Sequence, residues 1–131
     1  MILGVANVWN DRKGLYDFIK LSKMLDERYK IVLVGLNDKQ IDVIKTSAPS
    51  ILALPRTANA GELVKLYSAA DVFVNPTYED TFPTVNMEAE ACGTAVITYD
   101  TCGCRETIKM SNSKVIKQDV KALYDNICKY A

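Results

Sequence analysis

The feature that most constrains this chain is the alternation of short β-branched runs with helical segments along its whole length. Continuous apolar runs are typical of strands buried on both faces, and a strand–helix repeat is typical of a parallel sheet covered by helices. The predicted strands are 2–8, 31–34, 51–54, 71–75, 94–99 and 115–116. The predicted helices are 15–28, a segment before Pro49, a segment from about Ala60, 83–91 and 119–129. Asn59 and Glu62 resemble a capping box at the start of the third of these helices. We therefore expect a single Rossmann-like, three-layer α/β domain with an open parallel sheet of about six strands.

Length and composition exclude several function classes. The 131 residues have the size of one domain, and 49% hydrophobic with 24% charged residues is ordinary for a folded soluble protein. The 16 Lys and Arg residues balance the 16 Asp and Glu residues. The chain therefore has no net field to attract nucleic acid or an anionic membrane, and any anion has to be bound locally.

The cysteines and the apolar runs argue against a metal site and a membrane segment. There is no histidine, and the four cysteines form no CxxC pair, so a zinc site would need all four thiolates. We expect reduced thiols and no metal ion. The longest apolar runs have the length of strands, and no start resembles a signal peptide, so we expect a cytoplasmic domain.

The most informative loop is Asn75-Pro76-Thr77-Tyr78-Glu79-Asp80-Thr81-Phe82-Pro83, which follows a predicted strand and leads into a helix. In open parallel sheets, ligands bind outside the carboxyl ends of the strands. A helix start offers unpaired N–H groups and the positive end of the helix dipole, which favour a phosphate. Thr81 adds a hydroxyl group, either as a ligand or as an N-cap, and Pro83 equally fits the first turn of a helix.

Two carboxylates flank this helix start. Asp80 lies at its mouth, and Glu88 follows about two turns later among mostly apolar residues. A carboxylate accepts two hydrogen bonds from a vicinal diol, so the pair suits a sugar and a ribose with a diphosphate between them. The alternative for Glu88 is a solvated position on the helix. Glu90 lies on a different helix face, and we expect it to be exposed.

Two further loops follow predicted strands. Arg12 and Lys13 follow the first strand, either as diphosphate partners or as ordinary solvated cations. In the loop after the fifth strand, Gly103 indicates a close backbone approach. Glu106 in the same loop either orients a sugar hydroxyl or caps the short helix that follows, and the residues leave this open.

Taken together, these segments resemble the C-terminal domain of the retaining GT-B glycosyltransferases of family 4, also called glycosyl transferases group 1. The resemblance covers nearly all of the chain, and it rests on GVANVWNDRKG, YKIVLVG and ELVKLYSAADVFVNPTYEDTFPTVNMEAEACGTAVITYDTCGCRE. The family's paired acidic motif has seven residues between its two carboxylates, and this register falls on Asp80 and Glu88.

The resemblance implies a role for each matching position. Asp80 is expected to contact the donor sugar, Glu88 the nucleotide ribose and Lys13 the diphosphate, and these three are the expected catalytic residues. Arg56 marks the region where the family binds the nucleobase. The full set of expected donor-binding residues is Arg12, Lys13, Arg56, Asp80, Thr81, Phe82, Pro83, Thr84, Glu88 and Glu106.

The chain also departs from the family pattern. Asp80 stands where Glu is commoner, which leaves the identity of the sugar open. The family's arginine before the phosphate-binding lysine is missing, since Ala6, Asn7 and Val8 occupy that stretch, and Arg12 is a candidate substitute. Cys102 replaces the first of two paired glycines.

The resemblance implies sugar transfer from a UDP- or GDP-linked donor to a glycan or lipid-linked acceptor with retention, without a cofactor. The family's N-terminal acceptor-binding domain is absent here, and Met1 runs straight into the first strand. We therefore expect an excised domain that binds the donor but transfers little alone, with membrane association only through the absent domain. The alternative is an inactive nucleotide-sugar-binding or scaffold module. A flavodoxin-like signalling domain is disfavoured, because Asn7, Val8 and Trp9 stand where acidic residues are needed.

Overall fold

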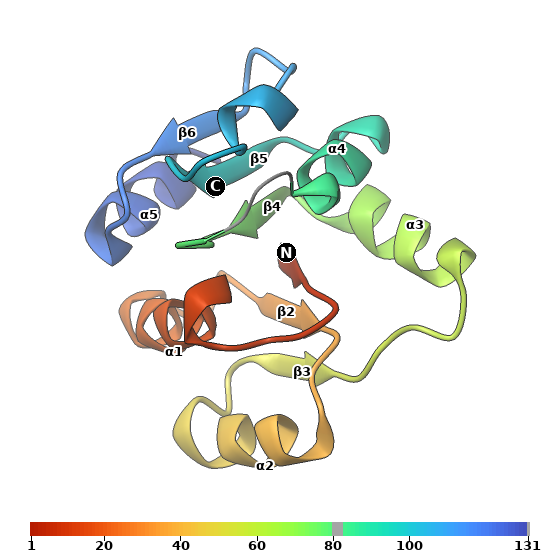
Figure 1. Ribbon diagram of the computed structural model, residues 1–131. Helices are drawn as coiled ribbons and strands as arrows, with labels where there is room; N and C mark the ends of the chain where they lie inside the picture. The colour runs from red at the N-terminus through yellow and green to blue at the C-terminus, as the bar shows by residue number, and fades with distance from the viewer. Residues whose placement is uncertain (80–82, 131) are drawn as a thin grey trace.

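A computed structural model describes residues 1–79 and 83–130, and its strands form one parallel sheet (Figure 1). The strands are β1 (Ile2–Val5), β2 (Ile31–Val34), β3 (Leu52–Leu54), β4 (Val72–Asn75), β5 (Val96–Tyr99) and β6 (Lys114–Ile116). Their order is β3-β2-β1-β4-β5-β6, and all neighbouring pairs are parallel. The predicted six-stranded fold is confirmed. The order reverses between β1 and β4, so the crevice that suits a ligand lies outside the carboxyl ends of these two strands.

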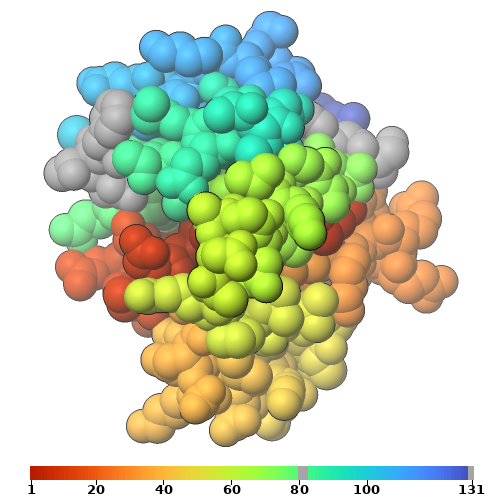
Figure 2. Space-filling view, turned by 90° about the vertical axis from the view of Figure 1, so that its right-hand side faces the viewer, coloured from red at the N-terminus to blue at the C-terminus, as the bar shows by residue number. Residues whose placement is uncertain are grey.

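Helices cover both faces of the sheet and make three layers. They are α1 (Leu15–Met24), α2 (Asp38–Ser47), α3 (Ala60–Ala69), α4 (Thr84–Ala91) and α5 (Val120–Ile127). The core under one face contains residues of α1, α2 and α5, and the core under the other contains residues of α3 and α4. Figure 2 looks onto the second face, where α3 lies across the sheet with α4 beside it. Within the described residues, no helix is long and apolar enough to cross a membrane.

The burial of the strands on both faces explains why their positions could be predicted from apolar runs. In β2, Ile31 and Leu33 point into the core of α1, α2 and α5, whereas Val32 and Val34 point into the core of α3 and α4. Successive side chains of a strand point to opposite faces, and here both faces are covered. A run of apolar residues without polar alternation is the result.

Side-chain caps fix the starts of α2 and α3. Asn37 and Gln40 form a capping box at α2, which the sequence analysis did not find. At α3, Asn59 Oδ1 accepts from the Glu62 amide at 3.0 Å, as the predicted capping box requires. Glu62 Oε2, however, accepts from the Ala58 amide at 2.9 Å, one residue before the N-cap. Both N-caps precede helices that the sequence predicted, but only α2 has the complete capping box.

Three predicted boundaries were wrong for local reasons. The first strand ends at Val5 instead of Val8, because the chain turns back so that Trp9 Nε1 donates to the Val34 carbonyl at 2.8 Å. The first helix ends at Met24, because the backbone of Leu25 is extended. The fourth helix begins at Thr84, because Pro83 has a ψ of 94° and serves as N-cap. Short 3-10 helices also occur at η1 (Asp11–Lys13), η2 (Arg105–Thr107) and η3 (Cys128–Tyr130).

Gly14 lets two loops approach each other at the carboxyl edge. Its φ is +88°, in the left-handed region, and a Cβ there would lie 2.3 Å from the Pro76 carbonyl oxygen. Gly93 has a similar φ of +83°, but nothing lies within 4 Å of its Cβ position. Both glycines therefore have a left-handed backbone that disfavours a side chain, but only at Gly14 would a side chain also clash with a neighbour.

We predict that Gly93→Ala lowers the free energy of unfolding by about 1 kcal/mol, the cost of a left-handed Cβ. Gly14→Ala should lower it by about 3 kcal/mol, because the methyl group adds an overpacking cost against Pro76. Urea denaturation of both variants measures the difference. Equal losses would show that the contact between the two loops is not tight.

Candidate functional site

Three adjoining pockets lie along the carboxyl edge of the sheet. The central pocket, about 350 Å³, lies between the loop after β1 and the start of α4. The Gln118 pocket, about 610 Å³, lies on the β5–β6 side, and the Arg56 pocket, about 280 Å³, lies on the β2–β3 side. The central pocket is lined by Val5, Ala6, Asn7, Val8, Asn10, Lys13, Asn75, Pro83, Thr84 and Val85. The Gln118 pocket is lined by Asn10, Arg12, Lys13, Tyr78, Glu79, Asp100, Thr101, Cys102 and Gln118.

Shared walls join these pockets into one groove. Asn7 and Val8 border both the Arg56 pocket and the central pocket. Asn10 and Lys13 border both the central pocket and the Gln118 pocket. The groove therefore crosses the switch point between β1 and β4, and Lys13 lies between its central and Gln118 pockets.

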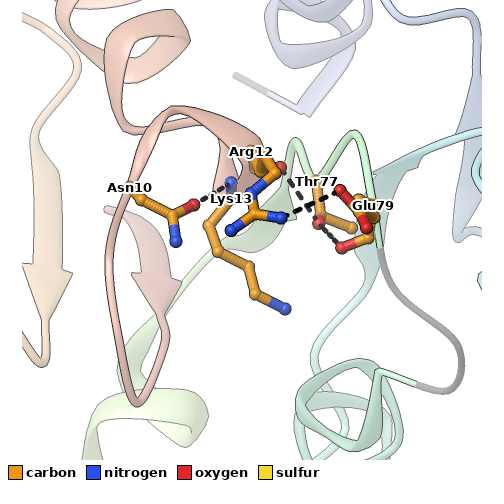
Figure 3. A network of polar contacts seen from close by, with 5 residues as sticks. All are labelled: Asn10, Arg12, Lys13, Thr77 and Glu79. Carbon is orange, nitrogen blue, oxygen red and sulfur yellow. Dashed lines mark hydrogen bonds and ion pairs between the residues drawn. The ribbon is translucent and has the colours of Figure 1, made fainter.

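The backbone of the loop after β1 positions Lys13. Asn10 Oδ1 accepts from the Lys13 amide at 3.0 Å and caps η1, and Gly14 closes this short helix with its left-handed backbone. Figure 3 shows the Lys13 side chain extending away from the neighbouring Arg12–Glu79 pair. The structure places Lys13 on the groove, and its role toward a diphosphate stays a prediction.

The Arg12 side chain points in a different direction from the Lys13 side chain. Its Nη1 lies 3.3 Å from Glu79 Oε2, and the two side chains are 70% and 68% exposed (Figure 3). An ion pair this exposed adds little stability. The Arg12 carbonyl also accepts from the Tyr78 amide at 2.7 Å, which ties the loop after β1 to the loop after β4.

The start of α4 forms the opposite wall of the central pocket. Pro83 is buried, and Thr84 lines the pocket. The predicted residues Asp80, Thr81 and Phe82 lie outside the described residues, so only Glu88 of the paired acidic motif can be placed. Glu88 follows Thr84 by four positions and lies on the same side of the helix.

Glu88 is exposed on α4 and contacts Tyr67 of α3. Tyr67 Oη donates to Glu88 Oε2 at 3.3 Å. Burial, with the nearby Glu88 carboxylate, raises the pKa of Tyr67 far above its ordinary value, so the phenol stays a donor. Glu88 does not line the three pockets described above. It is accessible to a ligand that runs along α4, and its ribose role stays a prediction.

A buried polar network fixes α4 against the sheet. Asn75 Nδ2 donates to Asn86 Oδ1 at 3.0 Å, and Asn86 Nδ2 donates to Thr107 Oγ1 at 3.1 Å and Thr98 Oγ1 at 3.4 Å. Asn86, Thr98 and Thr107 are at most 1% exposed. The network joins α4 to β4, β5 and η2, so it sets the position of the helix start.

A second buried cluster fixes the loop after β4. The carboxylate of Asp17, on α1, accepts from the hydroxyls of Tyr78 and Tyr99, the latter at 2.7 Å. Asp17 is only 5% exposed. The sequence analysis missed this residue, although its position four residues before the buried Leu21 places it on the core side of α1.

Three remaining sequence predictions have mixed outcomes. Arg56 borders the groove, with Nη2 donating to the Asn7 carbonyl at 3.0 Å. Glu106 is exposed in η2, whose N-cap is Cys104, so Glu106 is not the cap. The expected exposure of Glu90 was wrong. Its carboxylate is partly buried because it accepts from the amides of Lys109 and Met110 and from Ser113 Oγ.

Thiols and carboxylates do not gather into a metal site in the part of the chain that the structure describes. Cys102 is exposed on the Gln118 pocket, whereas Cys104 is buried beside it. The groups that face the groove are cations, carboxylates, amides, hydroxyls and some apolar side chains, which suit a polar organic ligand.

Comparison with known proteins relates this chain to a family. Residues 1–131 match the family model of glycosyl transferases group 1. A curated relative is the N,N'-diacetylbacillosaminyl-diphospho-undecaprenol alpha-1,3-N-acetylgalactosaminyltransferase of Campylobacter jejuni, 28% identical over 136 residues, which cover 96% of this chain and 36% of that protein. The chain thus spans about a third of that relative's length.

Two solved structures share the fold. HepE of Anabaena, in complex with UDP-glucose, matches with a TM-score of 0.81 and 18% identity over 98% of this chain and 38% of that chain. Sucrose-phosphate synthase of Thermosynechococcus elongatus matches with a TM-score of 0.82 and 24% identity over 98% of this chain and 35% of that chain.

We predict that Tyr78 makes stability fall at alkaline pH. Burial first, and then the hydrogen bond to Asp17, raise the pKa of Tyr78 to about 12. An unfolded tyrosine ionises near pH 10, so the unfolded chain loses this proton first and unfolding becomes easier from about pH 10 to pH 12. Tyr78→Phe should reduce this slope, measured by urea denaturation at several pH values. Identical slopes in the two proteins would contradict the assignment.

Proposed function

The chain belongs to the group 1 glycosyl transferases, and on this basis we propose that it is the donor-binding domain of an enzyme that transfers sugar from a nucleoside-diphosphate sugar with retention. The acceptor is a glycan or a lipid-linked saccharide. The observation that carries the proposal is the groove across the switch point, with Lys13 facing the start of α4. HepE, which shares the fold, was solved with UDP-glucose.

The groove supports one direction for the donor. The nucleobase lies in the Arg56 pocket, and the diphosphate lies in the central pocket between Lys13 and the first amides of α4. Glu88, one turn beyond Thr84, accepts hydrogen bonds from the ribose diol. By resemblance to the family, Asp80 contacts the donor sugar. In this order the anion is held locally, by one cation and one helix start.

The proposed chemistry is assisted departure of the diphosphate. The bond between the anomeric carbon and the phosphate oxygen breaks, an acceptor hydroxyl oxygen forms the new bond on the same face of the sugar, and its proton passes to the departing diphosphate. Negative charge grows on the leaving diphosphate. The Lys13 ammonium and the α4 amides stabilise that charge because they are already oriented toward it. No cofactor and no metal ion enter this proposal, and the donor is UDP- or GDP-linked.

The chain covers about a third of its curated relative, so the acceptor is proposed to bind mainly on a second domain. A rival proposal is a nucleotide-sugar-binding or scaffold module without transfer, which the substitution of Ala6, Asn7 and Val8 for the family's arginine favours. Incubating the full-length protein with a UDP-sugar and an acceptor separates the two, and the anomeric configuration of the product tests retention.

We predict that Lys13→Ala weakens binding of UDP-glucose or GDP-mannose by about tenfold or more, because a charge-assisted hydrogen bond contributes roughly 1.5–3 kcal/mol. Calorimetric titration measures the affinity. Lys20→Ala, which removes a lysine that lies over Tyr16 on α1, is the matched control and should bind as the wild type does. An equal loss of affinity in both variants would contradict the role of Lys13 in diphosphate binding.

We predict that Glu88 recognises the ribose hydroxyls. The wild-type chain should bind UDP more tightly than 2′,3′-dideoxy-UDP, and Glu88→Ala should lose most of this preference. A thermal-shift titration with each ligand measures this preference, because the tighter ligand stabilises the fold more. A ligand at about 100 times its Kd adds about 2.7 kcal/mol of stability. If Glu88→Ala keeps the preference for UDP, Glu88 does not recognise the ribose. If no UDP-, GDP- or ADP-sugar stabilises the wild-type chain, the proposed donor site is wrong.

A further inference from the structure

The Gln118 pocket is the largest of the three pockets of the groove, and the nucleotide part of the proposed donor leaves it unused. A nucleotide that runs from the Arg56 pocket to Lys13 fills the central pocket and stops at the shared wall. The Gln118 pocket continues beyond that wall, at about 610 Å³, and its lining residues come from the loops after β1, β4, β5 and β6. Pro83, Thr84 and Val85, which face the donor at the start of α4, border the central pocket instead.

The charges around this pocket are largely paired. Arg12 pairs with Glu79, and Arg105 donates to both carboxylate oxygens of Asp100 at 3.0 and 2.9 Å. Glu79 and Asp100 on the wall are thus each matched by an arginine. Such a wall favours a neutral, hydrogen-bonding ligand over a second anion.

Tyr78 gives this pocket a rigid aromatic surface. Its hydroxyl is held by the buried Asp17 carboxylate, and its ring packs edge-on against Tyr99, with centroids 5.2 Å apart and an interplanar angle of 64°. The residue is nevertheless 38% exposed. An immobilised ring that borders a polar pocket can cover the C–H face of a sugar ring without losing conformational freedom on binding.

The polar wall is also held in place. Gln118 Nε2 donates to Thr101 Oγ1 at 3.0 Å, and Thr101 Oγ1 donates in turn to the Thr77 carbonyl. The Gln118 amide, together with Asn10 and Asp100, offers the mixed donors and acceptors that sugar hydroxyls need.

We propose that the Gln118 pocket binds a neutral pyranose ring of the acceptor, stacked on Tyr78 and hydrogen-bonded by Gln118, beside the donor diphosphate at Lys13. This inference rests on the proposed function. It assigns part of acceptor recognition to this domain, with Asp17 as a positioning residue for Tyr78. A donor sugar is the other source of a pyranose, and the experiment distinguishes it.

The test is an NMR titration of the ¹⁵N-labelled chain, with and without saturating UDP. The probes are the methyl pyranosides of glucose, galactose, N-acetylglucosamine and N-acetylgalactosamine. The expected result is that at least one glycoside shifts the amides of Tyr78, Thr101 and Gln118 while UDP stays bound. Tyr78→Ala should weaken this binding about tenfold, and Gln118→Ala about fivefold, with UDP affinity within about twofold of the wild type.

Two further variants serve as controls for the effect of Tyr78→Ala. Tyr16→Ala removes an exposed tyrosine of α1 outside the pocket and should bind glycosides as the wild type does. Tyr78→Phe keeps the ring and loses the bond to Asp17, so it should weaken glycosides less than Tyr78→Ala does.

Each contrary outcome is distinct. UDP binding without any glycoside shift at the pocket overturns this inference and leaves the proposed function standing. Displacement of the glycoside by UDP-glucose but not by UDP assigns the pocket to the donor sugar and also overturns it. Failure of the wild-type chain to bind any nucleotide or nucleotide sugar overturns the proposed function, and with it the acceptor role.

Discussion

The side-chain amide of Asn86 is the contact on which the rest of the site depends. It accepts from Asn75 at the end of β4 and donates to Thr107 in η2 and to Thr98 on β5, all in the interior. An amide in such a place is costly unless both of its ends are paired, so the pairing strongly favours one position of α4. The amides at the start of this eight-residue helix therefore face the central pocket in a fixed direction.

The loops at the same edge are fixed by equally specific contacts. The Arg12 carbonyl receives the Tyr78 amide, Gly14 permits the close approach to Pro76, and Asp17 binds the two tyrosine hydroxyls. Each contact joins the segment after β1 to the loop after β4 or to the last residue of β5. The groove is thus preorganised by the protein before any ligand enters, which lowers the ordering cost of binding and of charge stabilisation.

The sequence predicted the elements better than their connections. The β2 run was located to the residue because it is buried on both faces, and Asn59 marked the start of α3. The end of β1 was missed because Trp9 turns back to a carbonyl 25 residues away. Glu90 was misjudged because its partners are backbone amides about 20 residues later.

In the candidate site, too, the contacts between residues distant in sequence could not be predicted. Lys13, Arg56 and Thr84 were predicted because each follows a strand or opens a helix, and parallel topology brings such positions to one edge, where they line the groove. Their binding roles stay predictions. Asp17 was missed because its partners lie 61 and 82 residues away, a separation that no local pattern encodes.

The proposed donor, a nucleoside-diphosphate sugar, lies along the groove with its diphosphate between Lys13 and the start of α4. A crystal structure of the chain with a UDP- or GDP-sugar would show this arrangement. Phosphate oxygens should lie within hydrogen-bonding distance of Lys13 Nζ and the α4 amides, with the ribose at Glu88 and the base in the Arg56 pocket. A nucleotide bound with its diphosphate away from Lys13 would rule the arrangement out.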